Sequence, residues 1–107
     1  MTRFTNEPLY QEGEEAVHYL IEPLSDTDGQ VIAYTSFDRE IRVKVELQPT
    51  DPDGKRFAGI SCKIVTETEP GEQEVVDGGY YRYEIPPSER YPLVYALNRA
   101  VNWAAGV

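Results

Sequence analysis

Two side chains in this chain could act together as a nucleophile and its base, namely the one cysteine, Cys62, and the one histidine, His18. A histidine that takes the thiol proton would leave Cys62 as a thiolate nucleophile. However, Cys62 alternates with Ile60 and Ile64, and this spacing predicts the apolar face of a strand. A thiol in apolar surroundings has a raised pKa and is inert. We therefore expect a buried cysteine and no catalytic dyad.

Metal chemistry is the second possibility, because the loops at 26–29 and 51–54 both have the pattern Asp-x-Asp-Gly. Several carboxylate oxygens around a glycine turn are typical of a calcium loop. When each glycine is aligned on such a loop, the position of the first aspartate holds Leu24 or Pro49. We therefore predict connecting turns. One cysteine and one histidine also cannot form the usual zinc site, so we expect no metal and no other cofactor.

Other signatures of catalysis are missing from the sequence. Neighbouring carboxylates such as Glu14 and Glu15 could do acid–base work, but with 19 acidic residues such pairs arise by chance. The sequence has no glycine-rich phosphate loop, nucleophile elbow or dinucleotide fingerprint. We therefore expect a protein that is not an enzyme.

The tyrosines are more informative, since there are eight of them and most lie in the C-terminal third. In a strand over 80–85, Tyr81 and Tyr83 share one face, while Tyr80 and Arg82 share the other. One helix can cover only one of these faces. Tyrosine and arginine are enriched in the centres of protein interfaces. The alternative is that these tyrosines border the core and keep only their hydroxyl groups in water. We predict a partner-binding surface that consists of Tyr80, Arg82, Tyr91 and Tyr95.

An acidic run with no basic residue between Lys63 and Arg82 is the other candidate surface. It consists of Glu67, Glu69, Glu72, Glu74 and Asp77. Carboxylates in a row can replace phosphates on a partner's basic surface. That function requires the acidic segments 7–28 and 67–77 to lie together. The simpler interpretation is a solvated face.

Composition limits the remaining classes. The chain has 107 residues, a net charge of −9 and 40% hydrophobic residues. It is too apolar for a disordered acidic tail, and no apolar run reaches the roughly 18 residues of a membrane helix. The first 13 residues do not resemble a signal peptide. The negative charge argues against binding nucleic acid or anionic lipid directly. We expect a cytoplasmic protein, or a virion protein if the chain is a viral structural component.

Hydrophobic periodicity predicts the elements. Alternation of Ile41, Val43, Val45 and Leu47 with charged residues predicts a strand with one buried face. Similar patterns predict strands at 30–37, 58–67, 73–76 and 80–85, with a turn at Pro70-Gly71 and a hairpin at Asp77-Gly78-Gly79. Residues 15–22 fit a strand, but their spacing also fits a helix. Leu93, Leu97, Ala100 and Ala104 lie on one face of a helix over 88–105, with Ser88 as its cap.

Together these patterns predict one α+β domain over 1–107. It has a polar N-terminal arm (1–15), an antiparallel meander of about five to six strands (16–85) and one C-terminal helix (88–105) packed on one face. We expect a non-catalytic protein-interaction or assembly protein with a protein partner. A small component of a viral or cellular particle and an oligomer both fit this expectation. The alternative is an acidic inhibitor of a nucleic-acid-binding protein.

Overall fold

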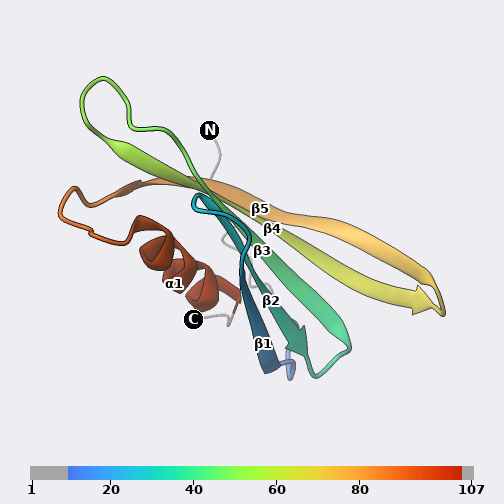
Figure 1. The fold of residues 1–107 in the computed structure, drawn as a ribbon. Coiled ribbons are helices and arrows are strands. Elements are labelled where there is room, and N and C mark those ends of the chain that lie inside the picture. Colours follow the sequence, from blue (N-terminus) through green and yellow to red (C-terminus); the bar gives the residue numbers. More distant parts are fainter. Residues whose placement is uncertain (1–9, 105–107) are drawn as a thin grey trace.

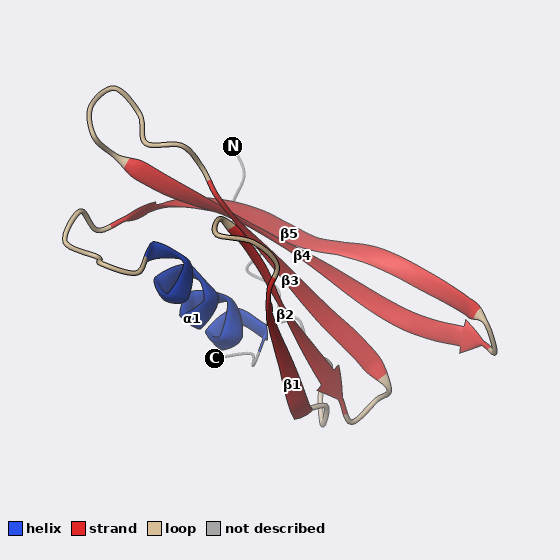
Figure 2. Cartoon of the chain, in the orientation of Figure 1, coloured by secondary structure: helices blue, strands red, loops and turns tan. Residues whose placement is uncertain are grey.

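The computed structural model describes residues 10–104, which form one sheet and one helix. The five strands run in the order β1-β2-β3-β4-β5, and each pairs antiparallel with its neighbour in sequence. Helix α1 packs on one face of this sheet (Figures 1 and 2). The predicted α+β meander with a C-terminal helix is confirmed. The elements are β1 Ala16–Pro23, β2 Asp28–Thr35, β3 Arg39–Leu47, β4 Arg56–Glu69, β5 Glu72–Ile85 and α1 Pro92–Ala104.

The core lies between α1 and the facing side of the sheet. Strand alternation sends every second side chain of β3 into this layer, and Ile41, Val43 and Val45 are fully buried. Their register partners on β4 are Ile64, Cys62 and Ile60, so the apolar positions of neighbouring strands coincide. This coincidence produces one continuous core because antiparallel partners point to the same side of a sheet.

Helix α1 begins later than the sequence suggested. Pro92 occupies its first turn, where the missing N–H has no partner in the helix, and the Tyr95 N–H donates to the Tyr91 carbonyl at 3.0 Å. Ser88 lies instead in a turn closed by the Glu89 N–H and the Pro86 carbonyl, so the predicted cap is wrong. The consecutive prolines Pro86 and Pro87 keep this stretch out of the helix.

The predicted hairpin at Asp77-Gly78-Gly79 is also wrong, because β5 runs through these residues without a break. Gly79 lies opposite Cys62 and Asp77 lies opposite Lys63, so Gly78 is the extra residue of a β-bulge. Gly79 takes a positive φ of 128°, which explains the glycine. The glycines therefore form a bulge and not a turn. Because the bulge adds one residue to β5, the side chains of 72–77 point to the opposite faces from those that unbroken alternation would give them.

Residues 16–23 form a strand, which decides between the two interpretations of 15–22. The segment before it is fixed at two points. The Tyr10 hydroxyl donates to the Ala104 carbonyl at the end of α1, and the Glu14 carboxylate binds Arg39 and Thr35 beside the β2–β3 turn. Part of the predicted N-terminal arm is therefore packed onto the domain.

Several expectations lie outside the described residues, namely the N-terminal part of the arm at 1–9 and the last predicted helical residue, Ala105. The helix in 10–104 is too short to cross a membrane.

Candidate functional site

The face of the sheet opposite α1, called here the distal face, carries Tyr80 and Arg82. Strand register aligns Tyr80 with Ser61 of β4 and Lys44 of β3, and it places Arg82 beside Gly59. All of these positions alternate with the buried core positions, so their side chains point away from α1. Tyr83 and Ile85, in contrast, are buried on the helix side. The predicted division of the 80–85 strand into two faces is therefore correct.

Arg82 is held in place on the distal face by two contacts. Its Nε donates to the Gln48 side-chain oxygen at 2.7 Å, and its guanidinium carbon lies 3.9 Å from the centre of the Phe57 ring. Stacking on an aromatic ring and a directional hydrogen bond both restrict an otherwise flexible side chain. Arg82 is exposed, so a partner would meet an ordered guanidinium and lose less conformational entropy on binding.

Tyr80 lies across the backbone of β4. A Cβ atom built on Gly59 would be 2.8 Å from the Tyr80 hydroxyl, so the missing side chain at Gly59 provides the space for the phenol. A depression of about 210 Å³ adjoins the tyrosine. It is lined by Lys44, Glu46, Gln48, Gly59, Ser61 and Tyr80. The distal face therefore has a depression beside an aromatic side chain, and the depression is lined by one basic residue, Lys44, and one acidic residue, Glu46.

The other two tyrosines of the predicted surface lie on the opposite side of the sheet. Tyr95 packs beside Tyr83 with ring centres 6.4 Å apart, and Tyr91 is exposed just before the first turn of α1. The structure thus brings Tyr80 together with Arg82 but separates both from Tyr91 and Tyr95. Tyr95 fits the interpretation that some tyrosines border the core.

The acidic run occupies the end of the β4–β5 hairpin, which forms an arm in Figure 1. Glu69 lies opposite Glu72, whereas Glu74 and Asp77 point to opposite faces because their register partners are Thr66 and Lys63. The hairpin also belongs to the edge of the sheet opposite β1, where the N-terminal acidic segment lies. The acids of 67–77 and the described acids of the 7–28 segment therefore do not form one stripe.

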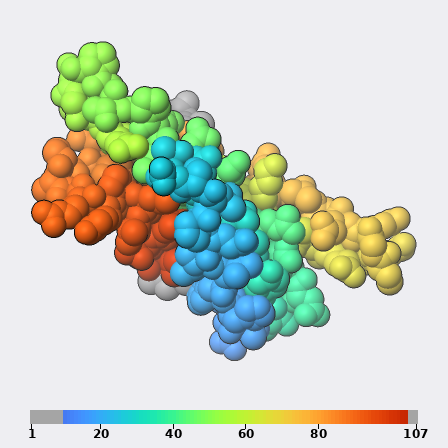
Figure 3. All heavy atoms as spheres, viewed as in Figure 1, coloured from blue at the N-terminus to red at the C-terminus, as the bar shows by residue number. Residues whose placement is uncertain are grey.

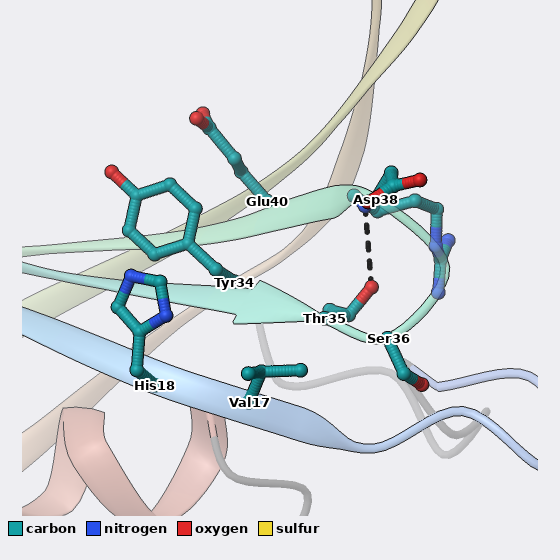
Figure 4. A pocket seen from close by; sticks show the side chains of 8 residues that line it. Val17, His18, Tyr34, Thr35, Ser36, Asp38 and Glu40 are labelled. Carbon is teal, nitrogen blue, oxygen red and sulfur yellow. Dashed lines mark hydrogen bonds between the residues drawn. The ribbon is translucent and has the colours of Figure 1, made fainter.

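Cys62 and His18 are on opposite faces of the sheet. Cys62 is 1% exposed in the core, and burial raises the pKa of its thiol to about 12. His18 stacks on Tyr34 of the distal face, with ring centres 4.5 Å apart (Figure 4). The sheet itself separates them, so they cannot form a dyad.

We expect a thiol reagent to label Cys62 at least about a hundredfold more slowly in the native protein than in urea, because labelling requires opening of the core. The matched control is Ser61→Cys, which adds a thiol to the distal face one residue away. It should label rapidly, while Cys62 in the same chain stays protected. Rapid labelling of Cys62 in the native protein would contradict its position in the core.

A second hollow, of about 460 Å³, lies beside His18 at the β2–β3 turn (Figure 4). The Thr35 hydroxyl in this hollow is already engaged, since it accepts the N–H groups of Phe37 and Arg39 at 3.2 Å. Across residues 10–104, no cluster of three or more His, Cys, Asp or Glu side chains could hold a metal ion. In the 51–54 loop, the Asp51 carboxylate accepts the N–H groups of Asp53 and Lys55, as in a connecting turn.

No protein-family model, curated protein or solved structure gave a significant match to this chain.

Sequence reasoning missed three residues of the distal face, namely Phe57, Gln48 and Gly59. The predicted strand began at Ala58, one residue too late for Phe57 to be placed on the face of Arg82. The alternation of Phe57, Gly59 and Ser61 with buried residues contained the necessary signal. Contact between Arg82 and Gln48 depends on the pairing of β3, β4 and β5, which alternation alone does not specify.

Proposed function

We propose that this chain is a non-catalytic interaction protein that binds a protein partner through the distal face of its sheet, with Arg82 and Tyr80 as the anchors. The observation that carries the proposal is the arrangement of Arg82, which is stacked on Phe57, bonded to Gln48 and still exposed. Such a complex would belong to the cytoplasm or to a cellular or viral particle.

Arginine and aromatic side chains on a sheet face support this function for a physical reason. A planar guanidinium can bond a partner's carboxylate in two places while its flat surface remains on an aromatic ring. The depression beside Tyr80 offers a place for a partner's side chain, and the adjoining Lys44 and Glu46 supply charges of both signs. Anchors of this kind carry most of the binding energy in protein interfaces.

The experiment begins with affinity purification from the native host and identification of the bound proteins by mass spectrometry. Calorimetry with the purified partner then compares the wild-type chain with Tyr80→Ala and Arg82→Ala. Truncating an anchor typically costs about 2 kcal/mol, so we expect each variant to bind roughly thirtyfold more weakly. Circular dichroism should show an unchanged fold, because both side chains lie on the sheet surface.

Tyr91→Ala is the matched control, since it removes an exposed tyrosine from the other side of the molecule. It should leave affinity unchanged. Lysine substitutions at Glu67, Glu69, Glu72 and Glu74 test the alternative function, that of an acidic inhibitor. If these substitutions abolish binding and the Tyr80 and Arg82 variants bind normally, the proposal is wrong and the acidic arm is the binding surface.

A further inference from the structure

Strand β1 is an edge strand with apolar side chains exposed along its length. Val17, Tyr19, Leu20 and Ile21 are between 41% and 64% exposed. Within the described residues β1 pairs only with β2, and its surface forms the front of the molecule in Figure 3. Because an unpaired strand presents a row of main-chain donors and acceptors, such an edge is able to pair with another strand.

Hydrogen bonding of β1 to β2 shows which main-chain groups point outward. The Leu24 N–H donates to the Asp28 carbonyl at 2.9 Å, so the even-numbered residues of β1 face β2. The N–H and C=O groups of Tyr19 and Ile21 therefore point away from the sheet. Pro23 follows the same alternation and occupies an outward position, where its missing N–H leaves the β1–β2 ladder intact.

The opposite edge of the sheet is protected against such pairing. On β5 the bulge at Gly78 interrupts the ladder, and the strand carries Glu74, Asp77, Arg82 and Glu84. Charges and bulges are devices that prevent edge-to-edge association. On β1, a bulge at Val17 and the proline at the end of the strand limit the accessible stretch to residues 18–22, in which Glu22 is the one acidic residue and His18 the one basic residue.

The geometry points to a second copy of this chain as the occupant, paired through β1 in an antiparallel arrangement about a two-fold axis at Leu20. Only outward-pointing residues can exchange main-chain hydrogen bonds, so Tyr19 must pair with an odd-numbered residue of the other copy. The ionisable side chains of His18 and Glu22 select the register, because only one register places them opposite each other. With Leu20 opposite itself, His18 of each copy lies opposite Glu22 of the other, on the distal face.

This register places Tyr19 of one copy against Ile21 of the other, where both exchange main-chain hydrogen bonds. The Glu22 carboxylate already accepts the Gln30 amide at 3.0 Å and His18 stacks on Tyr34, so both side chains are positioned in advance. A shift by two residues in either direction places His18 opposite a leucine and loses both charge contacts. The dimer joins two five-stranded sheets into one, with both distal faces on the same side.

Disulfide trapping tests the register directly. Leu20 lies in a non-hydrogen-bonded position at the axis, where opposing Cα atoms are about 4.5 Å apart, a separation that a disulfide spans. Leu20→Cys should therefore form a covalent dimer on mild oxidation. In Ile21→Cys the two thiols belong to residues about 8 Å apart, beyond disulfide reach, so this matched control should stay monomeric. The native Cys62 is buried and does not compete.

Analytical ultracentrifugation tests whether the untreated protein associates. We expect the wild-type mass to rise with concentration from 12.2 kDa to twice that value. Leu20→Lys, which places like charges together at the axis, should remain monomeric with an unchanged fold. Val94→Lys, at a residue of α1 that is more exposed than Leu20, should dimerise normally.

His18→Glu should also prevent dimerisation, and adding Glu22→Lys to it should restore the dimer because the charges are then exchanged. A wild-type protein that stays at 12.2 kDa up to about 1 mM overturns the inference, since that excludes a useful affinity. So does a cross-link in Ile21→Cys instead of Leu20→Cys, which would indicate another register. Neither result affects the proposed binding of a different protein by Tyr80 and Arg82, which lie on β5 at the opposite edge of the sheet.

Discussion

Replacing Arg39 by methionine should destabilise the protein by about 3–5 kcal/mol, because it leaves a buried carboxylate without its counter-charge. The Glu14 side chain is 0% exposed and that of Arg39 is 12% exposed. Arg39 Nε donates to the Glu14 carboxylate at 2.8 Å, and the Thr35 hydroxyl donates to it at 2.6 Å. Urea denaturation of the two proteins measures the loss. The expected loss is large compared with the total free energy of unfolding of an ordinary domain, which is roughly 5–15 kcal/mol.

A second arginine–glutamate pair serves as the matched control. Arg42 and Glu40 are 43% and 26% exposed, and Arg42 Nε donates to the carboxylate at 2.8 Å. Exposed ion pairs contribute about 0–1 kcal/mol, so Arg42→Met should change stability little. Equal losses in the two variants would show that the enclosure of Glu14 has no energetic consequence.

The same ion pair predicts how stability depends on pH. Burial raises the pKa of Glu14, but hydrogen bonds from Arg39, Thr35 and the Gln11 N–H outweigh it and lower the pKa from 4.5 to about 2. A folded-state pKa below the unfolded value stabilises the protein above pH 4.5, and this stabilisation is lost as the pH falls toward 2. The contribution is roughly 3 kcal/mol.

In Arg39→Met burial should dominate, so the carboxyl pKa should rise and acid should no longer weaken the fold through Glu14. The quantity to measure is the difference in unfolding free energy between wild type and variant from pH 2 to pH 6, in which the contributions of the other acids largely cancel. This difference should shrink as the pH falls. A difference independent of pH would show that Glu14 is not held ionised by Arg39.

Strand periodicity was enough to predict most of the fold. The alternation in β3 and the helical spacing of Leu93, Leu97 and Ala100 are local signals, and each reports burial on one face of one element. Misplaced boundaries occurred where a local signal has two structural outcomes. Asp77-Gly78-Gly79 permits a positive φ, which serves a hairpin or a bulge, and only pairing with Cys62 and Lys63 decides between them.

The contacts of Glu14 and Arg82 were harder to predict because their partners are distant in sequence. Glu14 belongs to a polar segment, and its role follows only from Arg39, 25 positions along the chain. Arg82 was predicted from its face of the strand, but its partner Gln48 lies 34 positions away. Residue type and alternation therefore indicated the face that we propose for binding, while the fold supplies the contacts that order Arg82 on it.

Gly29 illustrates the same limit, since the sequence assigned it to a turn and the structure places it in β2 beneath α1. A Cβ atom built there would lie 2.9 Å from the Leu97 Cδ2 and 3.3 Å from the Glu22 carbonyl oxygen. Leu97 is 8% exposed and has little freedom to move away. The absent side chain of Gly29 therefore allows this leucine to lie directly on the strand.

We expect Leu97→Ala to cost about 2–5 kcal/mol through the cavity it leaves, and Gly29→Ala to cost about 1–3 kcal/mol through crowding. In the double variant the new methyl group enters the space that the leucine vacated. The combined loss, measured by urea denaturation, should thus be smaller than the sum by about 1 kcal/mol or more.

Leu97→Ala combined with Arg42→Met is the control, because Arg42 lies on the distal face and the two losses should add within about 0.5 kcal/mol. Additive losses for Gly29→Ala and Leu97→Ala would mean that the two sites do not share a contact. A combined loss smaller than the sum would instead show that α1 can approach β2 this closely only because position 29 is a glycine.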